Sequence, residues 1–223
     1  MLNSSKIDRR NILLLTPPIL IGIAVFVFVR PITQDELYHS FADQRTLLGI
    51  PNFWNVVSNL PFAIVGILGL RSARDLASRL LFAGVLLTAF GSAYYHWQPD
   101  TQRLLWDRLP MTIVFMSLFA IVAGRRLLFP LLCLGIASVI WWRISGDLRL
   151  YVLVQFVPMV MIPVLLLTTR VKPGLWAVLG FYALAKVAEA GDAALYSVLP
   201  LSGHTWKHLL AALATYCILR WRR

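Results

Sequence analysis

Charged residues are scarce in this sequence of 223 residues, and acidic residues are scarcer than basic ones. Only 14% of the residues are charged, whereas an average soluble domain has about 25%. Hydrophobic residues make up 59% of the chain, and its mean hydropathy is +0.72. A chain this apolar cannot be solvated on all sides, which excludes an ordinary soluble domain. We therefore expect one compact domain embedded in a membrane.

Cysteine is almost missing as well. Cys133 and Cys217 both lie within apolar runs, so their placement does not indicate a disulfide framework. We expect both to be small packing residues. The sequence also lacks a repeat of fixed period and any segment of low complexity.

The shortage of acidic residues leaves a net charge of +11. In a soluble protein this charge would suggest a nucleic-acid partner. Here the basic residues lie mostly at the ends of apolar runs, where they contact anionic headgroups and determine topology. We therefore expect membrane lipid, and no nucleic acid, as the partner.

Long apolar runs are abundant. The first, at 11–29, follows a basic segment and has two interpretations, a signal peptide or a retained transmembrane helix. It is long for a signal peptide and no small-residue cleavage site follows it, which favours the retained helix. Seven more runs of roughly sixteen to twenty residues follow, near the ~20 needed to span a membrane. They cover 53–70, 80–96, 109–124, 127–142, 150–169, 175–192 and 204–219.

These runs predict an all-α, polytopic transmembrane helix bundle with short connections between neighbouring helices. The expected division is a cytoplasmic tail with one extra transmembrane helix (1–30), a non-cytoplasmic surface loop (31–52) and a seven-helix core (53–223). The sequence does not indicate the oligomeric state.

Lysine and arginine in the connections predict the orientation. If the N-terminus is cytoplasmic, thirteen of them lie on the cytoplasmic side: Lys6, Arg9, Arg10, Arg71, Arg74, Arg79, Arg125, Arg126, Arg170, Lys172, Arg220, Arg222 and Arg223. Six lie on the other side: Arg30, Arg45, Arg103, Arg108, Arg143 and Arg149. The excess predicts that both termini are cytoplasmic.

Histidine is rare, and three of the four histidines fall in two polar clusters. His204 and His208 are four residues apart, so on a helix both imidazoles lie on one face and can reach a single ion. In a bundle of eight alternating spans, His96, Asp107 and His204 lie at the same, non-cytoplasmic ends of their helices. We therefore predict one zinc ion held by His96, His204 and His208.

A catalytic zinc takes three protein ligands and keeps its fourth position for water, whose pKa falls toward ~7. Asp107 could accept a proton from that water and deliver it to a leaving amine. Ser92 lies four residues before His96, on the same helical face, and its hydroxyl could donate to the oxyanion. An apolar cleft between helices would take the acyl chain of a lipid.

Each of these residues also has a structural interpretation. A histidine near a helix end can be a hydrogen-bonded interface residue, which is what we expect of His39. Asp107 can cap its helix or pair with Arg103 or Arg108. Ser92 can be a small residue that allows close packing of helices.

A further set of polar residues, Lys186, Glu189 and Asp192, recurs at spacings of three in the run 175–192. We interpret them as a structural ion-pair ladder, with contact to a lipid headgroup as the second interpretation. A transporter would use them as a relay, but no matching pair of broken half-helices supports that function.

Together the two clusters resemble the alkaline ceramidase family. The resemblance rests on Ser92-x3-His96, on Asp107 eleven residues after that histidine, and on His204-x3-His208. The stretch 52–61, Asn-Phe-Trp-Asn-Val-Val-Ser-Asn-Leu-Pro, is also similar to the family pattern, and the resemblance covers about residues 43–219. The family is part of a superfamily of seven-helix membrane hydrolases that includes the progestin and adiponectin receptors and hemolysin III-like proteins. The eleven-residue step resembles the ceramidase branch.

The resemblance implies a zinc-dependent amidase that converts a ceramide-like N-acyl lipid to a fatty acid and a free sphingoid-type base. By position, His96, His204 and His208 would hold one zinc per chain, and Ser92 and Asp107 would be the catalytic residues. The alternative within the superfamily is a receptor-like or hemolysin III-like protein whose zinc is structural, with a protein group in the fourth position and no hydrolysis.

Calcium is a further cofactor of some members of the family, bound by acidic residues of the N-terminal loop and by a glutamate just before the Phe-Trp-Asn stretch. Asn52 occupies that position here, and the loop acids Asp35, Glu36 and Asp43 give no clear match. The sequence therefore argues against a calcium site.

Overall fold

The computed structural model describes residues 9–168 and 174–222, with side chains from residue 16 to 167 and from 174 to 222. Helices account for 81% of the residues, and the described part of the chain contains no strand. The prediction of an all-α helix bundle is confirmed.

Each predicted apolar run forms a helix, and the run at 53–70 is divided in two at Ser58 and Asn59. The predicted end of the fifth core run, Thr169, lies outside the described residues. The helices are α1 (Arg9–Phe28), α2 (Phe53–Val57), α3 (Leu60–Ser72), α4 (Leu76–Trp97), α5 (Thr101–Ala123), α6 (Leu128–Ser145), α7 (Arg149–Thr168), α8 (Gly174–Ala190), α9 (Asp192–Tyr196) and α10 (Gly203–Arg222), with short 3₁₀ turns η1 (Glu36–His39) and η2 (Arg125–Leu127).

The helices of the bundle are those of a multi-pass membrane protein. Among the described residues, five helical stretches are long and apolar enough to cross a membrane: α2 with α3, α4, α5, η2 with α6, and α7. Large apolar side chains such as Phe90, Ile140 and Leu167 point outward from them. Such exposure suits a surface that faces lipid rather than water.

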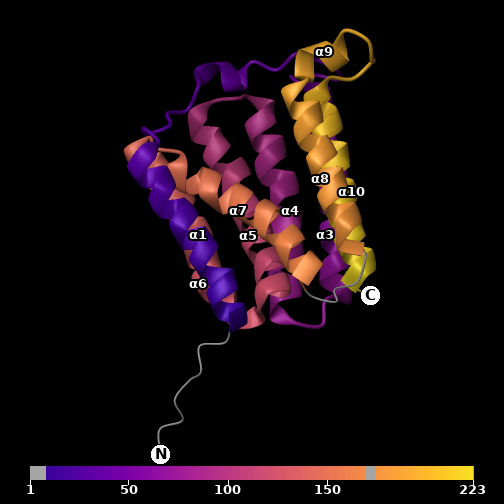
Figure 1. The fold of residues 1–223 in the computed structure, drawn as a ribbon. Coiled ribbons are helices and arrows are strands. Elements are labelled where there is room, and N and C mark those ends of the chain that lie inside the picture. Colours follow the sequence, from indigo (N-terminus) through magenta and orange to yellow (C-terminus); the bar gives the residue numbers. More distant parts are fainter. Residues whose placement is uncertain (1–8, 169–173, 223) are drawn as a thin grey trace, which may run out of the picture.

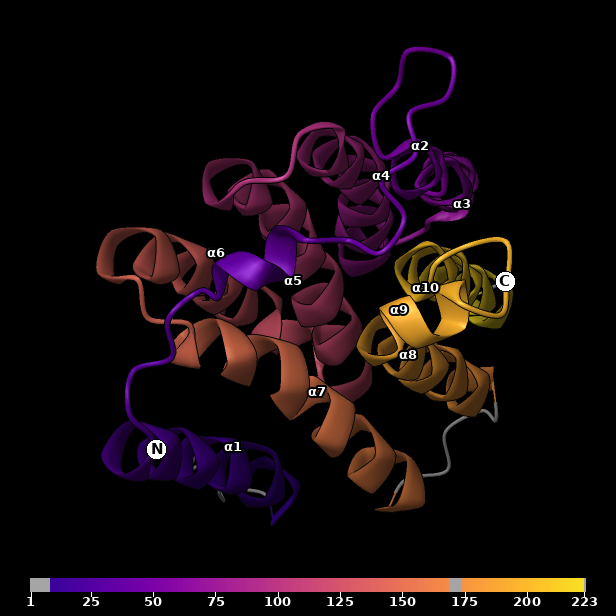
Figure 2. The same ribbon diagram turned by 90° about the horizontal axis from the view of Figure 1, so that it is seen from above.

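The helices pack with their neighbours in the chain (Figure 1). α4 lies between α3 and α5, α10 packs on α8 and α3, and α7 packs on α5 and α6, with α1 against α7 at the edge. The view from above shows the end of the bundle that carries α9 (Figure 2). This end lies opposite the start of α1 and the end of α10 (Figure 1).

Gly91 brings α4 and α5 together near this end. A Cβ atom at Gly91 would lie 2.0 Å from the carbonyl oxygen of Trp106, which no side chain can tolerate without movement of the backbone. The absence of a side chain therefore allows the close approach that sets Ser92 beside Asp107.

The predicted start of the third core helix at residue 109 is wrong. α5 begins at Thr101, because the Asp100 carboxylate accepts a hydrogen bond of 2.6 Å from the backbone N–H of Arg103 and caps the helix. Asp107 therefore lies in the second turn of α5 and not at its start. The polar residues 101–108 resemble a connection in sequence, yet they are helical and pack with Leu104 buried.

The prediction that Asp192 belongs to the same helix as Lys186 and Glu189 is also wrong. α8 ends at Ala190, and Asp192 begins the separate short helix α9. Its carboxylate accepts the backbone N–H groups of Ala42 (2.9 Å) and His204 (2.7 Å). Asp192 therefore fixes the start of α10 to the N-terminal loop.

That loop, residues 31–52, crosses the end of the bundle (Figure 2). Its Phe41 and Asp43 are buried. Burial opposes ionisation of the Asp43 carboxyl, but hydrogen bonds and the charge of Arg45 hold its pKa below the usual value. Arg45 also donates to the carbonyl of Pro200 at 2.8 Å, which ties the loop to the α9–α10 connection. The loop therefore covers this end of the bundle.

Candidate metal centre

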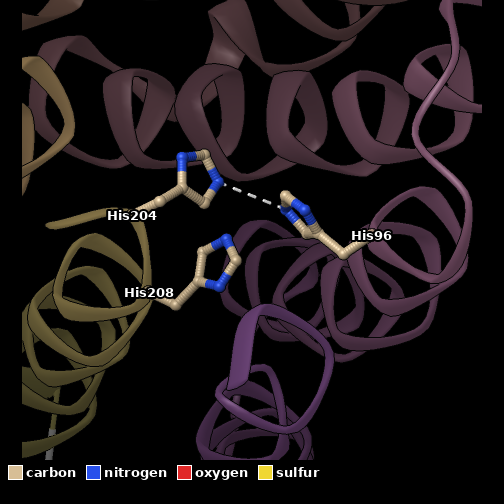
Figure 3. Close-up of side chains that lie close together, drawn as sticks. All are labelled: His96, His204 and His208. Atoms are coloured by element: carbon tan, nitrogen blue, oxygen red, sulfur yellow. Dashed lines mark hydrogen bonds between the residues drawn. The ribbon is translucent and has the colours of Figure 1, made fainter. Parts of the chain in front are cut away.

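Three buried imidazoles point toward one another (Figure 3). His96 comes from the last turn of α4, and His204 and His208 come from the first two turns of α10. Their exposed fractions are 0%, 4% and 4%. One ring nitrogen of each lies within 4.8 Å of the others, so all three can bind one metal ion. The predicted assembly of these histidines from distant parts of the chain is thus seen in the structure.

The spacing of one pair of these nitrogens matches that of two ligands of a tetrahedral metal ion. Bonds of ~2.0–2.1 Å at tetrahedral angles place two ligand nitrogens ~3.3 Å apart. The Nε2 atoms of His96 and His204 are 3.3 Å apart. No side chain moves are needed to bring this pair to ligand distance.

The other ring nitrogen of His208 is held from outside the cluster. Its Nδ1 lies 2.8 Å from the Ser58 hydroxyl, which itself donates to the carbonyl of Asn55. Such a contact fixes the orientation of the ring and directs Nε2 inward, as is usual for metal-binding histidines. The break between α2 and α3 supplies Ser58, and nothing in its local sequence marks that role.

Phe41 closes the cluster on the loop side. Its ring centroid lies 4.7 Å from that of His96 and 4.4 Å from that of His204. This apolar ring covers the imidazoles on the loop side, and reasoning from the sequence missed it because the loop is mostly polar in sequence.

Ser92 and Asp107 line a cavity together with His208. Both side chains are buried. Asp100 caps α5 and pairs with Arg103. Asp107 therefore neither caps its helix nor is the acidic partner of Arg103. The carboxylate is left facing the site.

An apolar cavity, partly open to the outside, begins at these residues. His208, Ser92, Asp107, Lys186 and Lys207 are polar residues of its wall. Most of the other residues of the wall are apolar, with Phe62, Phe115 and Ile162 among them. A cavity with this apolar lining is suited to an alkyl chain.

The fourth histidine has the structural role expected of it. His39 Nδ1 lies 2.8 Å from the Tyr95 hydroxyl and Nε2 lies 2.9 Å from the Thr101 hydroxyl. Both ring nitrogens have partners, and His39 is not part of the metal cluster among the described residues.

The predicted ion pairing in α8 is found in altered form. Lys186 lies 2.7 Å from Glu189, as its spacing predicts, but the second partner of Glu189 is Lys207 of α10 at 2.5 Å. Lys207 lies between the two histidines in the sequence and reaches the same cavity. Sequence reasoning gave it no role, because its partner is on another helix.

Comparison with known proteins agrees with the geometry. The family model described as Ceramidase matches residues 47–179, more than half of the chain. The matched segment includes Ser92, His96 and Asp107, whereas His204 and His208 lie beyond it. A search of the curated proteins finds no match.

Proposed function

The chain belongs to the ceramidase family, and from this premise we propose that it is a zinc-dependent amidase of the membrane. Its substrate is a ceramide-like N-acyl lipid, which it hydrolyses to a fatty acid and a free sphingoid-type base. The observation that carries the proposal is the convergence of three buried imidazoles beside an apolar cavity that His208 lines. Neither a packing role nor a surface role accounts for both features.

The metal ligands in this proposal are His96, His204 and His208. When bound there, a zinc ion supplies a Lewis acid that makes water nucleophilic at neutral pH. Ser58 and Phe41 hold and shield the imidazoles, and the cavity directs the acyl chain away from them.

Asp107 is the proton carrier of the proposed reaction. Its carboxylate faces the site and can accept a proton from the attacking water, then return it to the amine that leaves. The oxygen of the water bonds to the acyl carbon, the C–N bond breaks, and the leaving amine takes the proton.

Ser92 supports the same step. Its hydroxyl lines the cavity with Asp107, and in this proposal it donates to the carbonyl oxygen of the substrate as negative charge develops. Because it is buried away from water, such a donor stabilises the developing charge more strongly than it would in solution.

A structural zinc in a receptor-like protein would need a protein group in the fourth position. Among the described residues, three histidines form the cluster, and no carboxylate or cysteine completes it. This supports hydrolysis over a purely structural ion.

We also propose that both termini are cytoplasmic and that the metal centre faces the other side. The excess of basic residues at the end where α1 starts and α10 ends supports this orientation.

The decisive experiment is release of fatty acid from an N-acyl sphingoid base by the detergent-purified protein. We expect hydrolysis that a zinc chelator abolishes and that added zinc restores, while magnesium does not. Release that continues after complete removal of metal, or no release by the zinc-loaded protein from any N-acyl lipid, would overturn the proposal.

A further inference from the structure

A second and more polar cavity adjoins the apolar one. It lies among the first turns of α5 and α7, the end of α8 and the start of α10, with Tyr38 of the loop in its wall. Asp107, Met111, Lys186 and Lys207 line both cavities. One molecule can therefore extend from the apolar cavity past Asp107 into the polar one.

Arg108 contributes a guanidinium to this polar cavity, and its exposed fraction is only 6%. Nη2 donates to the Gln34 side chain at 2.7 Å, but Nη1 is buried without a hydrogen-bond partner. In the part of the chain that the structure describes, no carboxylate lies within ion-pair distance of Arg108. A buried cation with an unused donor is costly unless an acceptor binds to it.

Aromatic rings hold the guanidinium in place. Its carbon lies 4.2 Å from the ring centroid of Trp142 and 4.8 Å from that of Tyr151. These contacts stabilise the charge in part and fix its plane. They provide no hydrogen-bond acceptor for Nη1, so this nitrogen is free to donate to a bound ligand.

The other charged residues leave the cavity positive. Lys186 and Lys207 share the single carboxylate of Glu189. With Arg108 there are three cations in the wall against two carboxylates, Glu189 and Asp107. At ordinary ionisation states the cavity has a net charge of plus one, which favours an anionic ligand.

We propose that the polar cavity binds an anionic group, a phosphate, sulfonate or carboxylate, on the amine half of the lipid substrate. The inference rests on the proposed amidase function and adds the substrate class to it. The chains of the lipid occupy the apolar cavity, the amide lies at Ser92 and Asp107, and the anion pairs with Arg108. The preferred substrate is an N-acyl amino lipid with a charged headgroup, in place of neutral ceramide.

The same anion chemistry could come from the carboxylate of the released fatty acid, so the test compares three probes. Binding of ceramide 1-phosphate, ceramide with the same chains, and free palmitate is measured in detergent with the full-length His204→Ala variant. The His204 side chain lines neither cavity, and without a ligand histidine no turnover consumes the lipid. We expect ceramide 1-phosphate to bind at least tenfold more tightly than ceramide. Equal affinity of these two lipids would overturn the inference, and this comparison needs no change at Arg108.

Arg108→Gln in the same background should remove most of that preference. The matched control is Arg143→Gln, which removes an exposed charge from the same end of the bundle and should leave the preference unchanged. If Arg108→Gln instead weakens only palmitate, the anion is that of the product and the headgroup assignment is wrong.

The two proposals fail in different ways. A zinc-loaded wild-type protein that hydrolyses no N-acyl lipid, while the binding preference persists, would end the amidase proposal and support the anion site. Equal hydrolysis of both lipids, with equal binding, would support the amidase and overturn the anion site.

Discussion

Asp107 is the residue at which the proposed chemistry can be separated from metal binding. Asparagine keeps the shape of the side chain but cannot carry a proton between water and amine. We expect Asp107→Asn to retain its zinc, because Asp107 is not among the clustered ligands, and to lose roughly 10²- to 10⁴-fold in kcat. The measurement pairs zinc content with the rate of fatty acid release.

Asp35→Asn provides the control for that change, since Asp35 caps the exposed turn η1 and asparagine caps as well. It should hydrolyse substrate at the wild-type rate. An Asp107→Asn protein with full turnover would remove Asp107 from the mechanism, and loss of zinc would make it a ligand.

Single residues of the site differ in how far the sequence reveals them. The spacing of His204 and His208 predicts a shared helical face, and alternation of the spans brings His96 to the same end of the bundle. The contacts of Ser58 and Phe41 could not be predicted, because each depends on how segments far apart in the chain meet. Short-range spacing contains no information about such contacts.

Among the helices, the pair α4 and α5 determines whether Ser92 meets Asp107. We expect Gly91→Ala to destabilise the protein by about 1–3 kcal/mol, because its Cβ would collide with the Trp106 carbonyl and separate the two helices. The rate of hydrolysis should fall as well, because Ser92 and Asp107 would be moved apart. Thermal unfolding in detergent and the rate of hydrolysis measure the two effects.

Gly180→Ala is the matched comparison. It makes the same change within α8, where a Cβ meets nothing within 4 Å. Since alanine is the better helix former by about 1 kcal/mol, this variant should be as stable as the wild type or slightly more stable. A Gly91→Ala protein of equal stability would show that the close approach of α4 and α5 is not needed.

The helices themselves were predictable because apolar runs of spanning length are a strong signal. The ends of the helices were harder to predict. α5 extends eight residues before its predicted start, through polar side chains that include Asp107. Residues that build a polar site inside a helix weaken the apolar pattern by which that helix is recognised.

On the scale of the whole molecule, a polar centre lies inside an apolar bundle, at the end away from the start of α1 and the end of α10. The sequence predicts the bundle and this shared end through hydropathy and the alternation of spans. The two cavities and their boundary at Asp107 could not be predicted, since they are formed by side chains from several helices and the loop.

The most direct measurement is the zinc content of the detergent-purified protein, wild type beside the His204→Ala/His208→Ala double variant. We predict about one zinc per chain in the wild type and none in the double variant. His39→Gln, which changes the histidine outside the cluster, should keep its zinc. A folded wild-type protein, never exposed to a chelator, that contains no zinc would contradict the proposed metal centre and with it the hydrolase function.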